Sequence, residues 1–153
     1  MVLACAKQEI TAETLPDEVI VEKEKNMEIS VLVNGKALKA ILFDNSSSVA
    51  LYELLQQGDL TIEMQDYSNF EKVGQLPKTL PQNDETIETE AGDLILYQGN
   101  SFVIYYDRNR WSLTRLGKIV GIDQAGLKQI LGPGDVAVTL STQDYTIHSD
   151  WRP

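Results

Sequence analysis

The stretch RWSLTRLGKI, residues 110–119, places an indole and a guanidinium close together in a segment of strand-like composition. Side chains of a strand alternate between two faces, so Trp111 and Arg115 share one face and Thr114 lies on the other. Arginine offers paired donors to a carboxylate, and tryptophan offers a flat contact surface for a peptide. The pattern predicts a ligand-binding face. The alternative is that Trp111 fills the interior and Arg115 pairs with an acidic residue.

Further polar and aromatic candidates come from two segments that we expect to be a loop and a turn. They are Tyr67, Phe70, Glu71 and Lys72 in residues 67–81, and Gln98 in the turn YQGN. Ordered loops on a rigid scaffold commonly present binding groups. If this loop folds beside residues 111–115, its side chains converge with the indole. One alternative is a solvated surface ion pair between Glu71 and Lys72. The other is that Gln98 is polar only because turn residues often are, for conformational reasons.

The sequence shows no pattern of known catalytic or metal chemistry. His148 is the single histidine, and no nucleophile-elbow motif accompanies it, which disfavours a hydrolase. The acidic residues have no calcium-loop spacing, and GKI at 117–119 lacks the glycine and span of a phosphate-binding loop. We therefore expect no catalytic residues, no metal and no cofactor.

Composition narrows the partners that this chain can have. Its 153 residues are enough for one domain and too few for two ordinary cores. Thirteen basic against 23 acidic residues give a net charge of −10, which repels nucleic acids and anionic lipid surfaces. Apolar stretches such as 102–106 are far shorter than the roughly 20 residues of a membrane-spanning helix. We expect a peptide or small-molecule ligand, with no nucleic acid and no transmembrane segment.

Cys5, the single cysteine, excludes an internal disulfide. The string VLAC, residues 2–5, resembles the end of a lipoprotein signal, although its basic and long apolar parts are missing. Lipidated Cys5 would place the protein in the cell envelope, or secreted; otherwise we expect a free thiol and a cytoplasmic protein. We expect residues 1–26 to be a tail with at most one edge strand. Residues 27–148 are expected to form the domain, and residues 149–153 a second tail.

The pattern along the domain predicts many strands and two short helices. Alternating apolar residues and Asn34-Gly35 predict a hairpin over 27–43. A helix is expected from Asn45 or Ser46 to Gly58, and another over 123–131 capped by Asp123. The remaining strands are expected at 60–65, 86–90, 93–97, 101–106, 111–120 and 136–140, with a short edge strand at 145–147. The three strands within residues 86–106 are expected to form a meander. Without βαβ units, this order predicts a mainly β protein, a closed antiparallel barrel.

Three strings carry a resemblance to a known family: the segment from DYSNFEKVGQLPKTLPQND to YQGN, then WSLTRLGKI, then LGPGDVAVTLS. Over most of residues 27–141 the chain resembles the small bacterial proteins grouped as cyclophilin-like domains. The resemblance implies an eight-stranded barrel with a helix near each open end. It conveys architecture more than activity, because that family is largely uncharacterised.

The prolyl isomerases share this barrel and keep a phenylalanine, histidine and arginine run. Here Phe70 is followed by Glu71 and Lys72, and no glutamine-glycine-glycine segment follows. Our leading hypothesis is therefore a non-catalytic barrel that binds a peptide or small ligand. The alternative is a divergent prolyl isomerase, with Arg115 as donor to the prolyl nitrogen and Phe70 and Trp111 as the pocket. A third is a lipid-tethered interaction module, which depends on Cys5.

Overall fold

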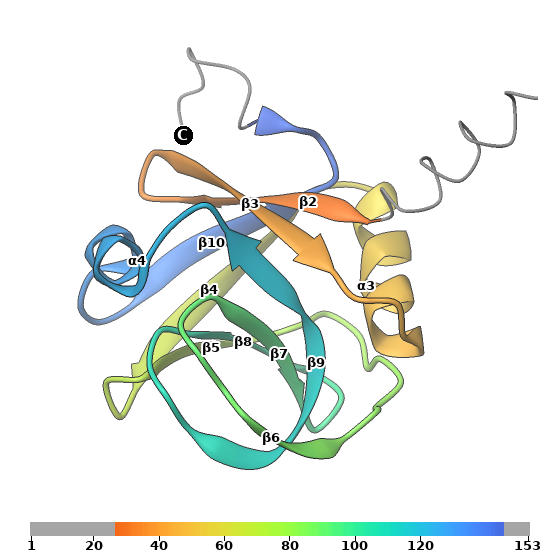
Figure 1. The fold of residues 1–153 in the computed structure, drawn as a ribbon. Coiled ribbons are helices and arrows are strands. Elements are labelled where there is room, and N and C mark those ends of the chain that lie inside the picture. Colours follow the sequence, from red (N-terminus) through yellow and green to blue (C-terminus); the bar gives the residue numbers. More distant parts are fainter. Residues whose placement is uncertain (1–26, 146–153) are drawn as a thin grey trace, which may run out of the picture.

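The computed structural model describes residues 27–145, which form a β-barrel with two helices (Figure 1). Cys5 and His148 lie outside these residues, as do the two predicted tails, so lipid attachment stays a prediction. None of the helices between residues 27 and 145 is long and apolar enough to cross a membrane.

The elements follow one another along the chain much as their patterns predict. They are β2 (Glu28–Val33), β3 (Lys36–Leu42), α3 (Ser46–Gln56), β4 (Leu60–Tyr67), β5 (Glu71–Gln75), β6 (Glu85–Glu88), β7 (Asp93–Tyr97), β8 (Ser101–Tyr105), β9 (Arg110–Val120), α4 (Gln124–Leu131) and β10 (Val136–Ser141). Asn34 and Gly35 have positive φ angles of 49° and 79°, as the predicted hairpin between β2 and β3 requires.

Eight strands close into an antiparallel barrel in the order β3-β2-β10-β4-β5-β8-β7-β9, and β9 pairs with β3 to complete the ring. The closing pair includes Leu42 opposite Gly117. A Cβ atom on Gly117 would lie 2.4 Å from the Ile41 carbonyl oxygen and 2.9 Å from the Leu42 Cα. The predicted closed barrel is confirmed, and glycine at position 117 allows the two backbones to meet.

The interior of the barrel is apolar, and a helix covers each end (Figure 1). Leu51 and Leu55 of α3 and Leu127 and Leu131 of α4 are almost fully buried in this core. Both helices begin at capping residues that the sequence indicates. Asn45 accepts a hydrogen bond from the Ser48 amide, and Asp123 accepts one from the Gly126 amide, each at 2.8 Å.

Two sequence expectations are wrong. Residues 67–81 are not one long loop, because they contain β5, which pairs with both β4 and β8. Gly74 does not break this strand; a Cβ there would lie 2.4 Å from the Ile62 Cγ2, so glycine lets β4 and β5 approach. Nor do the strands of residues 85–105 form a meander, since β6 pairs with β9 and not with β7.

Candidate functional site

The outer face of the barrel wall carries three rows of side chains across β4, β5, β8 and β7. The rows are Tyr67, Glu71 and Tyr105; then Gln65, Val73, Val103 and Ile95; and then Gln75, Ser101 and Tyr97. Strand residues alternate between faces, so these side chains point away from the apolar interior that their neighbours fill.

A two-stranded ribbon, formed by β6 and residues 110–113 of β9, covers part of this outer face. Beyond residue 113, β9 pairs with β7 instead, with an irregular register at Leu94/Ile95. Figure 1 shows the ribbon at the bottom of the view, below β5, β7 and β8. Its residues join those of the wall in a second apolar cluster, here called the outer cluster: Ile87, Ile95, Val103, Tyr105 and Leu113.

A groove of about 760 Å³ is open beside the outer cluster; we call it the outer groove. Its lining comes from β4, the β4–β5 turn, β5, β7, β8, the β8–β9 loop and the start of β9: Glu63, Gln65, Asp66, Tyr67, Phe70, Glu71, Val73, Gly74, Gln75, Tyr97, Ser101, Val103, Tyr105, Asn109, Trp111 and Leu113. Tyr67 and Trp111 are 59% and 58% exposed, which is unusual for such large rings.

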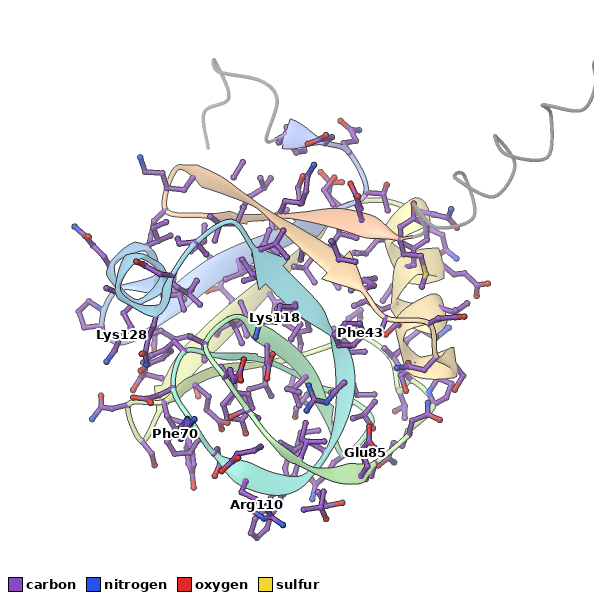
Figure 2. The ribbon with its side chains drawn as sticks, in the orientation of Figure 1. Phe43, Phe70, Glu85, Arg110, Lys118 and Lys128 are labelled. Atoms are coloured by element: carbon purple, nitrogen blue, oxygen red, sulfur yellow. The ribbon has the colours of Figure 1, made fainter. Side chains whose placement is uncertain are left out.

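Aromatic contacts order one part of the outer groove. The Phe70 ring stacks on Tyr105 with centroids 5.9 Å apart and an angle of 7° between the ring planes. Tyr67 meets Phe70 edge-on, with centroids 6.0 Å apart. Figure 2 shows Phe70 at the lower left of the barrel and Arg110, which precedes Trp111, on the ribbon at the bottom. Edge-to-face and offset-stacked contacts of this kind stabilise the relative positions of the rings.

Glu71 lies in the row between Tyr67 and Tyr105 and is only 9% exposed. Burial raises its pKa, as does the charge of Asp66, and the hydrogen bond from the Tyr105 hydroxyl opposes the rise. Burial and Glu71 together raise the pKa of Tyr105. The Asn109 amide donates to the Tyr105 hydroxyl at 3.1 Å. The Glu71 carboxyl is therefore held in position, in a site that disfavours its charge.

Asp66, in contrast, has its charge compensated from the inner side of the wall. Lys72 is fully buried; its Nζ lies 3.2 Å from Asp66 Oδ1 and donates to the Gly134 carbonyl at 2.6 Å. Burial of Asp66 alone would raise its pKa. The hydrogen bonds from Tyr106 and Lys72 and the charge of Lys72 outweigh burial and lower the pKa. Asp66 thus stays ionised with a cation of its own.

A family model matches this chain over residues 31–141, and its description is the cyclophilin-like family. The chain belongs to the cyclophilin-like family. The match covers the barrel from within β2 to the end of β10, in agreement with the resemblance and with the closed eight-stranded architecture. No curated protein is significantly similar to this cyclophilin-like chain.

The cyclophilin-like barrel brings four of the predicted site residues together in the outer groove. Tyr67, Phe70, Glu71 and Trp111 all line it. Trp111 does not fill the interior, as the alternative interpretation held, but lies half-exposed on the ribbon. Residues more than 40 positions apart along the chain therefore share one surface of the cyclophilin-like fold.

The other four predicted residues are not among those that line the groove. Lys72 and Thr114 are fully buried, and the Thr114 hydroxyl donates to Asp84 Oδ1 at 2.6 Å and accepts from the Asn83 amide at 2.8 Å. Gln98 is exposed in a turn and donates to the Tyr97 hydroxyl at 3.3 Å. Arg115 lies on β9 opposite Ile95, a residue of the outer cluster.

Sequence reasoning missed the groove residues that come from β7 and β8. Tyr97, Val103 and Tyr105 look like ordinary core residues in their strands. A signal was present, because Phe102–Tyr105 is a continuous apolar run without alternation. Such a run indicates a strand covered on both faces, so something had to cover the outside of this barrel wall.

The make-up of the outer groove is similar to that of ligand pockets in general. It combines rings, apolar wall residues and a few polar side chains at fixed positions, which is the usual make-up of a ligand pocket. In the part of the chain that the structure describes, no three histidine, cysteine or acidic side chains gather as a metal site would require.

Proposed function

We propose that this cyclophilin-like barrel is a binding module that takes a peptide or small ligand in the outer groove and does not catalyse a reaction on it. The observation that carries the proposal is the groove itself. Its volume of about 760 Å³ lies within the range of known ligand pockets, about 300–1,000 Å³. Trp111 and Tyr67 expose large ring surfaces where a ligand would cover them.

The experiment compares ligand retention by two single variants of the full chain. Trp111→Ala removes an exposed ring of the groove, and the control Val120→Ala removes an exposed apolar side chain at the other end of β9. The immobilised proteins are exposed to pools of acetylated, amidated pentapeptides. We expect Trp111→Ala to retain about tenfold less peptide than the wild type, and Val120→Ala to match the wild type. Equal retention by both variants, or none by the wild type, would contradict the proposal.

The isomerase alternative needs a donor aimed at the prolyl nitrogen beside an apolar pocket. Phe70 and Trp111 line the groove, whereas Arg115, opposite Ile95 on β7, is not one of the groove-lining residues. We expect no rate enhancement in a protease-coupled proline-peptide assay at micromolar protein. An enhancement that Arg115→Ala abolishes would favour the enzyme over the binding module.

A further inference from the structure

The charged residues that line the outer groove are all acidic. Its lining includes the acidic residues Glu63, Asp66 and Glu71, and none of its lining residues within 27–145 is a lysine or an arginine. Asp66 already has Lys72 as its cation. In the described structure Glu63 and Glu71 form no ion pair. Two of the three negative charges at this surface are thus left without a counter-charge from the protein.

We infer that the outer groove selects a peptide segment carrying a lysine or arginine side chain, whose cationic group binds at Glu71. The inference rests on the proposed function and specifies its ligand. A buried carboxylate without a cation is unfavourable, and an incoming ammonium or guanidinium group removes that penalty. The strength of the interaction would come from the low exposure of Glu71, since fully exposed ion pairs contribute little.

The aromatic rings around Glu71 favour the same ligand. Tyr67 and Tyr105 flank it in its row, and Phe70 stacks on Tyr105. Aromatic faces attract cations, most strongly where water is excluded, and their flat surfaces also accept the methylene stem of a basic side chain. Rings together with a carboxylate form a site for a cation with an apolar stem. Glu71 would repel the charge of a carboxylate ligand at this position.

The rest of the groove fits an extended peptide around that side chain. Gln65, Gln75, Ser101 and Asn109 line it with donors and acceptors that a peptide backbone can use. Its volume of about 760 Å³ exceeds that of a single side chain several-fold. The net charge of −10 raises the local concentration of basic peptides around the whole molecule.

The test uses the full chain and pools of acetylated, amidated pentapeptides that differ only in one fixed residue. The fixed residue is arginine, lysine, citrulline, norleucine or glutamate, and the other positions are neutral. Citrulline has nearly the shape of arginine without its charge, and norleucine keeps the aliphatic stem of lysine without the ammonium group. At low salt we expect the arginine and lysine pools to be retained about tenfold more than their neutral partners, and the glutamate pool least.

Two variants assign the preference to one carboxylate. Glu71→Gln should lose about tenfold discrimination between arginine and citrulline while still retaining the neutral pools. Glu53→Gln, an exposed change of equal charge on α3, should keep the discrimination. Equal discrimination by both variants would overturn the inference, because it would reflect net charge alone.

The remaining outcomes separate this inference from the proposed function. If the arginine and citrulline pools are retained equally, and Trp111→Ala abolishes retention of both, the cation preference is overturned and the binding module stands. If the wild type retains no pool above the level of Trp111→Ala, both are overturned.

Discussion

Glu71 and Lys72 are consecutive residues of β5, yet their side chains lie on opposite faces of the barrel wall. Glu71 lines the outer groove, and Lys72 is fully buried with its Nζ 3.2 Å from Asp66 Oδ1. Two charges that are adjacent in sequence therefore do not neutralise each other. Lys72 pairs with Asp66 on the inner side of the wall, and Glu71 has no cationic partner among the described residues.

Lys72→Met should destabilise the fold by about 2–3 kcal/mol, because it leaves Asp66 without its cation and the Gly134 carbonyl without its donor. Urea unfolding at pH 7 measures the loss. The control is Lys39→Met, whose partner Glu28 is exposed, and it should cost under about 1 kcal/mol. Equal losses for the two variants would contradict the structural role of Lys72.

The ion pair between Asp66 and Lys72 should also affect the pH dependence of folding stability. The pKa of Asp66 is lower in the folded chain than in the unfolded chain, so its contribution is fully present at neutral pH. That contribution falls as the pH drops below about 4 and through the folded pKa. We expect the stability difference between the wild type and Lys72→Met to shrink over this acidic range, as followed by urea unfolding. A constant difference would argue against the pair.

Relative to the wild type, Glu71→Gln should become more stable as the pH rises, whereas Lys72→Met becomes less stable. Burial raises the folded pKa of Glu71, so the unfolded chain ionises first as the pH rises, and wild-type stability decreases between the two pKa values. Glutamine cannot ionise, so Glu71→Gln should gain on the wild type from about pH 4 upward. Urea midpoints at several pH values test this. Glu85→Gln, an exposed change on β6, is the control and should show no such gain.

Part of the fold was predictable because local pattern and long-range packing agree there. Alternating apolar residues and Asn34-Gly35 predict the first hairpin, and Asn45 and Asp123 predict the starts of both helices. In each case the deciding interactions join residues close in sequence. Closure into a barrel followed from the count of strands and the absence of βαβ order.

The missed strand, β5, depends on partners far away in the sequence. Its sequence EKVGQ contains a lysine and a glycine on the inner face, which no local pattern reads as strand. Lys72 is acceptable there only because Asp66 and Gly134 receive it, and Gly74 only because Ile62 lies against it. The pairing of β6 with β9 is equally non-local, so the sequence could not show which element covers the outer cluster.

The candidate site was half predictable for the same reason. Alternation predicts Trp111 and Arg115 on one face, but only the structure shows that Trp111 lines the outer groove and that Arg115, opposite Ile95, does not. The negative net charge of the chain predicts a partner other than a nucleic acid. The acidic lining of the outer groove supports the same prediction for that surface.

Gly117→Ala should weaken closure of the barrel. The added Cβ would lie 2.4 Å from the Ile41 carbonyl oxygen, and backbone atoms cannot yield as a flexible side chain would. We expect a loss of about 3 kcal/mol or more, measured by thermal or urea unfolding. Ser112→Ala, an exposed change on the same strand, should stay within about 0.5 kcal/mol of the wild type. A fully stable Gly117→Ala would show that β3 and β9 do not meet as closely as described.

Tyr105→Phe should raise the pKa of Glu71 further, because the hydroxyl that favours its charged form is removed. NMR titration of the Glu71 side-chain carbonyl carbon measures this directly. Tyr97→Phe also removes a hydroxyl from the groove wall, one that hydrogen-bonds Gln98, and should leave the pKa unchanged. The same pKa in all three proteins would mean that Tyr105 does not contact Glu71.

The most direct test of the outer groove is amide chemical-shift mapping on the ¹⁵N-labelled full chain during titration with the most strongly retained arginine-containing pentapeptide. We predict that the largest shifts fall on Glu71, Val73, Val103 and Trp111, and that Leu51 in α3 and Leu127 in α4 stay unchanged. Shifts concentrated on α3 or α4, with those groove residues unmoved, would contradict the account.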